Sequence, residues 1–162
     1  MRATPLPDGL RFHHPAVLAA TFFGAGLSPF AAGTAGSLAA LPFAWLIHVW
    51  LGQWALVATA AIAFAVGLWA AGVYARADDH GDPGAVVIDE VAGQWLTLAA
   101  VAATPLNFAV GFVLFRIYDI VKPWPANRID RGMHGGLGIM LDDVVAAVYA
   151  AATLWVIANV TA

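Results

Sequence analysis

Two pairs of adjacent carboxylates stand out in a chain that has few charged residues. Asp89 and Glu90 form the first pair, and Asp142 and Asp143 form the second. Magnesium binds oxygen ligands in a near-octahedral shell, usually one or two carboxylates with waters and substrate phosphate. We therefore predict that these four residues hold Mg²⁺, with Asp89, Glu90 and Asp143 also taking part in catalysis.

Each pair has a simpler explanation as well. A carboxylate near a helix N-terminus is favoured by the helix dipole, so capping could account for one residue of a pair. Two adjacent pairs among so few charges nevertheless favour a shared metal site. Asp82 and Asp119 are second-rank ligand candidates. Asp119 lies three residues from both Arg116 and Lys122, so a local salt-bridge network explains it equally well.

An anionic substrate would need cationic groups near these acids. Lys122 and Arg131 are candidates to bind phosphate oxygens. His134 could also bind them, or it could protonate the leaving group, since imidazole titrates near neutrality. Arg128 could equally bind anionic lipid head groups. A glycine turn that opens a helix offers a second phosphate cradle, with Thr34, Gly36 and Ser37 as its substrate-binding residues.

The composition around these residues is that of a membrane protein. Apolar residues make up 62% of the 162 positions and charged residues only 10%, whereas soluble domains average roughly 45 to 50% and about 25%. Residues 12–75, 91–115 and 144–162 contain no Asp, Glu, Lys or Arg, and about 20 apolar residues span a bilayer. We predict one all-α domain over 1–162, a compact polytopic membrane helix bundle, rather than a soluble bundle.

Apolar segments and the breaks between them predict four to five main helices. They are expected at about 38–50, 54–74, 89–103, 106–121 and 141–158. Prolines and glycines within 122–140 predict a long loop before the last helix. Residues 1–32 contain several glycines and prolines, and we expect them to form an interfacial or re-entrant segment.

The distribution of charge predicts that the chemistry lies on one side of the membrane. If the N-terminus is cytoplasmic, two helical hairpins and one outgoing helix bring all seven basic residues and all ten carboxylates to the cytoplasmic side. This arrangement obeys the positive-inside rule. We therefore expect an active site that faces the cytoplasm.

Several kinds of function are excluded. The chain has no cysteine, which excludes disulfides, thiolate metal sites and a cysteine nucleophile. Its basic residues form no block typical of a nucleic-acid surface, so we expect no nucleic-acid partner. The sequence also lacks an Asp-x-Asp motif, which would supply an aspartate nucleophile, and the Pro-Ser-Gly-His element expected of a lipid phosphatase with a histidine nucleophile. Attack by a water that a metal ion activates is the phosphatase chemistry that fits best.

Four separated segments resemble the phosphatidylglycerophosphatase A family. They read GTAGSL at 33–38, DPGAVVIDE at 82–90, FRIYDIVKPWP at 115–125 and HGGLGIMLDD at 134–143. The resemblance implies a multi-pass enzyme of the bacterial inner membrane. Such an enzyme uses Mg²⁺ to hydrolyse phosphatidylglycerophosphate to phosphatidylglycerol and inorganic phosphate in phospholipid synthesis. Residues 1–32 carry little of the resemblance, and Ala35 stands where the family often has a larger residue.

Three other functions fit part of the pattern. CDP-alcohol phosphotransferases also cluster aspartates at a membrane face, but their Asp-x-x-Asp-Gly-x-x-Ala-Arg motif does not occur here. Carboxylates at membrane depth often line ion paths, so a divalent-cation transporter is an alternative. A non-catalytic lipid-binding subunit would tolerate the loss of Glu90, whereas a phosphatase would not. Lipid substrate and membrane are the expected partners, and the sequence predicts no particular oligomeric state.

Overall fold

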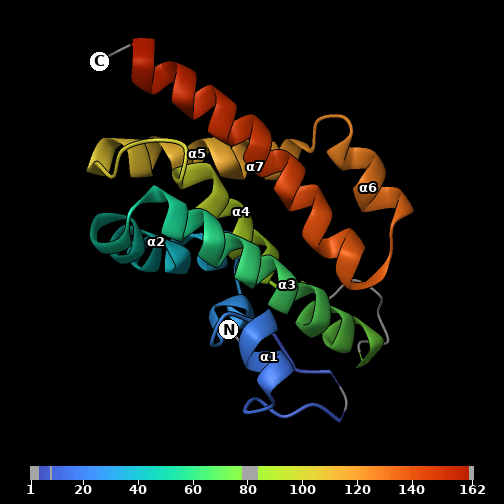
Figure 1. The fold of residues 1–162 in the computed structure, drawn as a ribbon. Helices are drawn as coiled ribbons and strands as arrows, with labels where there is room; N and C mark the ends of the chain where they lie inside the picture. The colour runs from blue at the N-terminus through green and yellow to red at the C-terminus, as the bar shows by residue number, and fades with distance from the viewer. Residues whose placement is uncertain (1–3, 8, 78–83, 161–162) are drawn as a thin grey trace.

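The computed structural model describes residues 4–7, 9–77 and 84–160, and every regular element in these parts of the chain is helical (Figure 1). The elements are α1 (Pro15–Ala20), the short 3-10 helix η1 (Ala25–Leu27), α2 (Ala32–Leu51), α3 (Gln53–Ala77), α4 (Ile88–Leu98), α5 (Pro105–Val121), α6 (Ala126–Gly132) and α7 (Gly135–Val160). The prediction of an all-α bundle is confirmed.

Within the described residues, three helices are long and apolar enough to cross a membrane. They are α2, α3 and α7, with 20, 25 and 26 residues, and 20 residues rise about 30 Å, which matches the hydrocarbon core. Large apolar side chains such as Ile62, Trp69 and Trp155 are exposed on their outer faces. Exposed apolar surface of this extent is typical of contact with lipid. The chain is therefore a helical membrane protein.

The second predicted hairpin is shorter than a pair of membrane spans. α4 has 11 residues and α5 has 17, and neither is among the three candidate spans. Of the two hairpins and one outgoing helix that we predict, the α2–α3 hairpin and α7 are long and apolar enough to span, whereas neither helix of the α4–α5 hairpin is a candidate span. An apolar run reveals burial, but it does not distinguish burial in lipid from burial among other helices.

α4 lies at the centre of the bundle and packs against α2, α3, α5 and α7 (Figure 1). Val91, Gln94 and Leu98 are completely buried. The indole Nε1 of Trp95 donates a hydrogen bond of 3.0 Å to the Ala40 carbonyl of α2. Because α4 is surrounded, any group at its N-terminal end also meets the ends of its neighbours.

Several predicted boundaries were wrong. The turn expected at 33–37 is part of α2, which begins at Ala32. The loop expected over 122–140 contains α6 and the first turns of α7, and α4 ends at Leu98 rather than near 103. Glycines that we interpreted as turn residues instead permit close packing. A Cβ on Gly136 would overlap the Leu68 carbonyl of α3, for example.

The N-terminal segment packs beside the loop that leads into α4. α1 contacts α3, and the backbone N–H of Val87 donates a hydrogen bond of 2.8 Å to the Ala20 carbonyl. With six and three residues, α1 and η1 are too short to cross a membrane. This agrees with the expected interfacial or re-entrant segment.

Candidate active site

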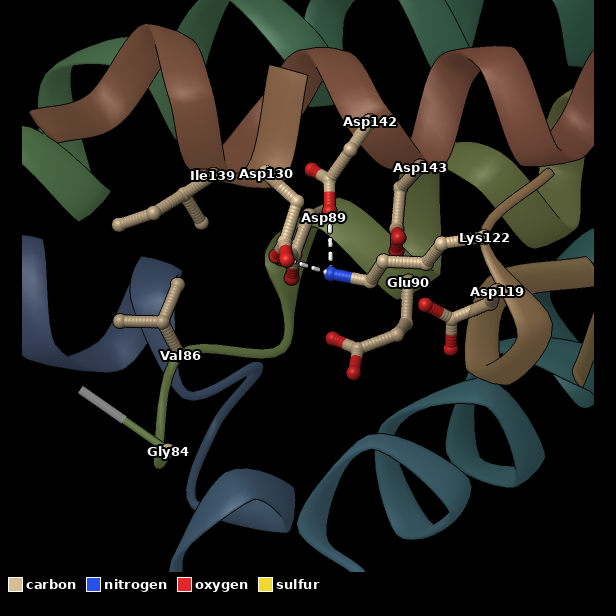
Figure 2. Close-up of a pocket in the computed structure, with 10 residues that line it drawn as sticks. All are labelled: Gly84, Val86, Asp89, Glu90, Asp119, Lys122, Asp130, Ile139, Asp142 and Asp143. Atoms are coloured by element: carbon tan, nitrogen blue, oxygen red, sulfur yellow. Dashed lines mark hydrogen bonds and ion pairs between the residues drawn. The ribbon is translucent and has the colours of Figure 1, made fainter. Parts of the chain in front are cut away.

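An acidic cavity of about 190 Å³ lies where the N-terminal end of α4 meets α7 and the C-terminal end of α5 (Figure 2). Its ionisable lining consists of Asp89, Glu90, Asp119, Lys122, Asp130, Asp142 and Asp143. The carboxylates far outnumber the single lysine, so the cavity carries excess negative charge when they are ionised. Such a cavity attracts cations.

Three of these carboxylates are close enough to share one ion. Oxygen atoms of Asp89, Glu90 and Asp143 all lie within 4.8 Å of one another. Asp89 and Glu90 occupy the first turn of α4, and Asp143 points toward them from α7 (Figure 2). Oxygens bound about 2.1 Å from one Mg²⁺ are at most about 4.2 Å apart, so the three residues need only a small contraction to ligate it.

The cluster contains oxygens that have no hydrogen-bond partner among the described residues. They are Asp89 Oδ1, Glu90 Oε2, Asp142 Oδ1 and Asp143 Oδ2, and all four are buried. Buried polar atoms in folded proteins are nearly always hydrogen-bonded or bound to a metal, because an unpaired one costs free energy. Burial, followed by the charge of Glu90, raises the pKa of Asp89 well above its usual value. These residues therefore fit a divalent cation.

Asp142 and Asp143 do not cap a helix. We expected them to open the last helix, but α7 begins at Gly135, so both lie in its second turn or beyond. The dipole of a helix acts mainly within its first turn. Helix capping therefore explains neither residue, whereas it can still contribute at Asp89 and Glu90.

Lys122 joins two carboxylates at the edge of the cavity. Its Nζ lies 2.5 Å from Asp142 Oδ2 and 2.5 Å from Asp130 Oδ1 (Figure 2). Burial alone would lower the pKa of Lys122, but the hydrogen bonds to Asp130 and Asp142 outweigh it and raise that pKa. The side chain of Asp130 is 44% exposed and that of Asp142 only 6%. Asp130 is therefore the partner that a ligand could replace.

Arg116 braces the opposite side of the cluster. Its Nη1 lies 2.5 Å from Asp119 Oδ2 and 3.6 Å from Glu90 Oε1, and it donates a hydrogen bond of 3.5 Å to Ser37 Oγ. Gly33 lies against the same groups, since a Cβ there would overlap Glu90 Oε1 and lie 3.0 Å from Arg116 Nη1. The predicted salt bridge between Arg116 and Asp119 is thus present, and Arg116 also contacts Glu90, a candidate metal ligand.

Other predicted site residues lie outside the cavity. Gly36 and Ser37 are buried within α2, where their backbone N–H groups can bond to carbonyls of the preceding turn. Thr34 faces an apolar hollow between α2 and α5. Arg131 and His134 are exposed and do not line the cavity. Asp82 lies outside the described residues.

Sequence reasoning missed two features of this site. Asp130 was not a candidate because α6, which carries it, was expected to be loop. The close approach of Gly33 to Glu90 was also missed, since the contact joins positions 57 residues apart. Its only signal was the glycine itself, within the GTAGSL segment.

Helical membrane architecture together with a buried acidic centre places the chain among membrane-embedded proteins that carry an acidic site within the helix bundle. Comparison with known proteins narrows this class. The family model described as phosphatidylglycerophosphatase A matches residues 18–158. No solved structure matches the chain.

Three curated relatives cover most of the chain. A phosphatidylglycerophosphatase A of Escherichia coli K12 is 41% identical over 93% of this chain and 87% of its own length. One of Haemophilus influenzae is 34% identical over 89% of each chain. A protein of Bacteroides thetaiotaomicron, provisionally named a phosphatidylinositol-3-phosphatase, is 39% identical over 87% of this chain and 94% of its own. The chain belongs to the phosphatidylglycerophosphatase A family and is a phosphatase.

Proposed function

We propose that this enzyme hydrolyses phosphatidylglycerophosphate to phosphatidylglycerol and inorganic phosphate in a Mg²⁺-dependent reaction of bacterial phospholipid synthesis. The observation that carries the proposal is the set of buried, unpaired carboxylate oxygens on Asp89, Glu90, Asp142 and Asp143. Two relatives named for this activity support the choice of substrate.

Asp89, Glu90 and Asp143 would hold the metal, with Asp142 and Asp119 beside them. When bound, one or two Mg²⁺ supply Lewis-acid stabilisation of the phosphoryl oxygens and activate the attacking water. Arg116 keeps Glu90 and Asp119 in position through its contacts with both. The ligand geometry is thereby set before substrate arrives, which limits the cost of reorganisation during the reaction.

Lys122 is the group best placed to bind the substrate phosphate. Its Nζ can exchange the hydrogen bond to the half-exposed Asp130 for one to a phosphate oxygen and keep the hydrogen bond to the buried Asp142. A lysine held in this way neutralises charge that develops on the transferring phosphoryl group. His134 does not line the cavity, so we assign it no step, and water is left to protonate the leaving oxygen.

Several basic residues of the described chain lie at the same end of the bundle as the cavity. Arg76 lies in the last turn of α3, Lys122 caps α5 and Arg131 lies in the last turn of α6. The α2–α3 connection and the C-terminal end of α7 lie at the opposite end and carry no Lys or Arg. The positive-inside rule then orients the cavity toward the cytoplasm, in a multi-pass protein of the inner membrane.

Phosphate release by purified protein tests the proposal. Release from phosphatidylglycerophosphate should require Mg²⁺ and fall at least about 100-fold in Asp89→Asn and Asp143→Asn, while Gln53→Ala, at the opposite end, should match the wild type. Phosphatidylinositol 3-phosphate serves as the comparison substrate because of the Bacteroides relative. Faster release from that lipid would reassign the head group. No release from either lipid by folded protein would refute the phosphatase, and Mg²⁺ flux in proteoliposomes would then test a transporter.

A further inference from the structure

Two apolar hollows follow the seam between α2 and α5. The first, of about 340 Å³, is lined by Thr34 of α2 and by Val113, Arg116 and Ile117 of α5, among others. The second, of about 540 Å³, is lined by residues that include Leu38 and Trp45 of α2 and Pro105 of α5. α2 and α5 pack against each other less extensively than either packs against α4, which leaves this seam partly open.

The two hollows lie one after the other along this seam, and we call them together the α2–α5 groove. From the first to the second, the lining residues ascend along α2 from Thr34 to Trp45 and descend along α5 from Val121 to Pro105. On α2 the two end residues are 11 positions apart, which corresponds to about 16 Å of helix. At the far end, the rings of Trp45 and Phe108 pack edge to face with centroids 5.0 Å apart. The groove is about as long as one leaflet's share, about 15 Å, of the hydrocarbon core.

Arg116 connects this groove to the acidic cavity. Its side chain lines the first hollow, and the same guanidinium contacts Glu90 and Asp119, which belong to the cavity. At this end the surface of α5 is strongly apolar, with Ile117 49% and Ile120 70% exposed. Arg116 therefore links the carboxylate cluster to an apolar groove.

We propose that an acyl chain of the lipid substrate lies in the α2–α5 groove, with its head group beside Arg116 and its phosphate in the acidic cavity. This inference rests on the proposed phosphatase function and identifies the side from which the lipid enters. A substrate held in this way reaches the carboxylates laterally from the bilayer and need not leave it. Acyl contacts then contribute binding energy remote from the phosphate.

A third hollow is the rival site. It lies among α3, α4 and α7 and is lined by residues that include Val57, Phe64, Leu96 and Val144. All its lining residues are apolar, so it has no group to hold the polar end of a lipid. The α2–α5 groove has Arg116 at the end nearest the carboxylates.

Filling the groove tests the proposal. Val113 lines the groove and is 52% exposed, whereas Val148 on α7 is 57% exposed and lines none of these hollows. Val113→Trp should raise KM for long-chain phosphatidylglycerophosphate about tenfold, the effect of losing contact with about two methylene groups. It should leave kcat/KM unchanged for the deacylated head group, glycerophosphoglycerophosphate. Val148→Trp should leave both substrates unaffected.

A labelling experiment reports binding without turnover. Phosphatidylglycerophosphate with a photoreactive diazirine in one acyl chain should label peptides of α2 and α5 in the wild type, and labelling should fall in Val113→Trp. Equal KM for Val113→Trp and Val148→Trp, or labelling confined to α3 and α7, would overturn the groove and favour the third hollow. Labelling of α2 and α5 without phosphate release would support the groove as a lipid-binding site. It would refute only the proposed phosphatase activity.

Discussion

Gly33 controls where the carboxylate of Glu90 can lie. A Cβ at this position would overlap Glu90 Oε1 and would lie only 3.0 Å from both the carboxylate carbon and Arg116 Nη1, whereas ordinary contacts begin at 3.4 Å. Gly33→Ala should therefore displace the carboxylate by about 1 Å, a shift that can cost about 100-fold in rate. This loss corresponds to about 2.7 kcal/mol of transition-state stabilisation.

The variant should nevertheless fold normally. The displaced atoms are the ends of flexible side chains, and alanine within a helix is favoured over glycine by about 0.5 to 1 kcal/mol. Gly72→Ala in α3 is a matched control, because its new Cβ would meet nothing closer than 3.5 Å. Thermal unfolding in detergent should show equal or higher Tm for both variants, and phosphate release should fall only in Gly33→Ala.

Shortening the neighbouring acid provides an internal check. Glu90→Asp withdraws the carboxylate by one methylene and so removes the overlap with alanine at position 33. Expressed as free energy, the loss of activity in the double variant should be smaller than the sum of the losses in the two single variants, as expected for residues in contact. Wild-type kcat in Gly33→Ala, or additive losses of kcat in the double variant, would refute the inferred effect of position 33 on the Glu90 carboxylate.

Three further predictions concern the ion, the lysine and the topology. Mg²⁺ should stabilise the wild type by about 2.7 kcal/mol at 100 times its Kd and should not stabilise Asp143→Asn; equal increases in Tm would mean that the ion binds elsewhere. Lys122→Met should lower the free energy of unfolding by about 2 kcal/mol, which is less than the 3 to 5 kcal/mol lost when a fully buried ion pair is broken. Lys122→Arg keeps the positive charge and should lower the free energy of unfolding less. If denaturant titration finds both variants as stable as the wild type, the ion pair with Asp142 does not stabilise the fold. Because the chain has no cysteine, a maleimide should label Arg128→Cys only from the cytoplasmic side and Gln53→Cys only from the other; labelling of both from one side would exclude the orientation.

The acidic centre was largely predictable because charge is scarce in this chain. Adjacent acids in an apolar sequence predict a shared site for Asp89, Glu90, Asp142 and Asp143, and the structure brings all four to one cavity. Lys122, which we predict to bind phosphate, also lines that cavity. Its pairing with Asp142, 20 positions away, depends on how α5, α6 and α7 meet, and no local pattern records that arrangement.

Glycine was the residue whose meaning sequence reasoning most often mistook. In the segments at 33–37 and 135–138 we interpreted glycines as turn formers, but most of them lie within helices. A glycine without a Cβ serves a turn and a close helix contact equally well. Only the neighbouring helix distinguishes these roles, and sequence does not reveal that neighbour. For the same reason the sequence does not predict α6, and it does not identify Asp130 on that helix as a site residue.

The close contact between α3 and α7 has a mechanical consequence for the enzyme. Gly136 of α7 has no room for a Cβ against the Leu68 carbonyl, and a Cβ on Gly67 of α3 would lie 2.6 Å from Met140 Cε. Two helices packed this closely move together as one stiff unit, because neither can slide along the other without a steric clash. Asp142 and Asp143 lie on that unit, only a few residues from Met140. A larger side chain at position 67 or 136 would therefore push α7 away from α3 and would shift Asp142 and Asp143 relative to the carboxylates of α4.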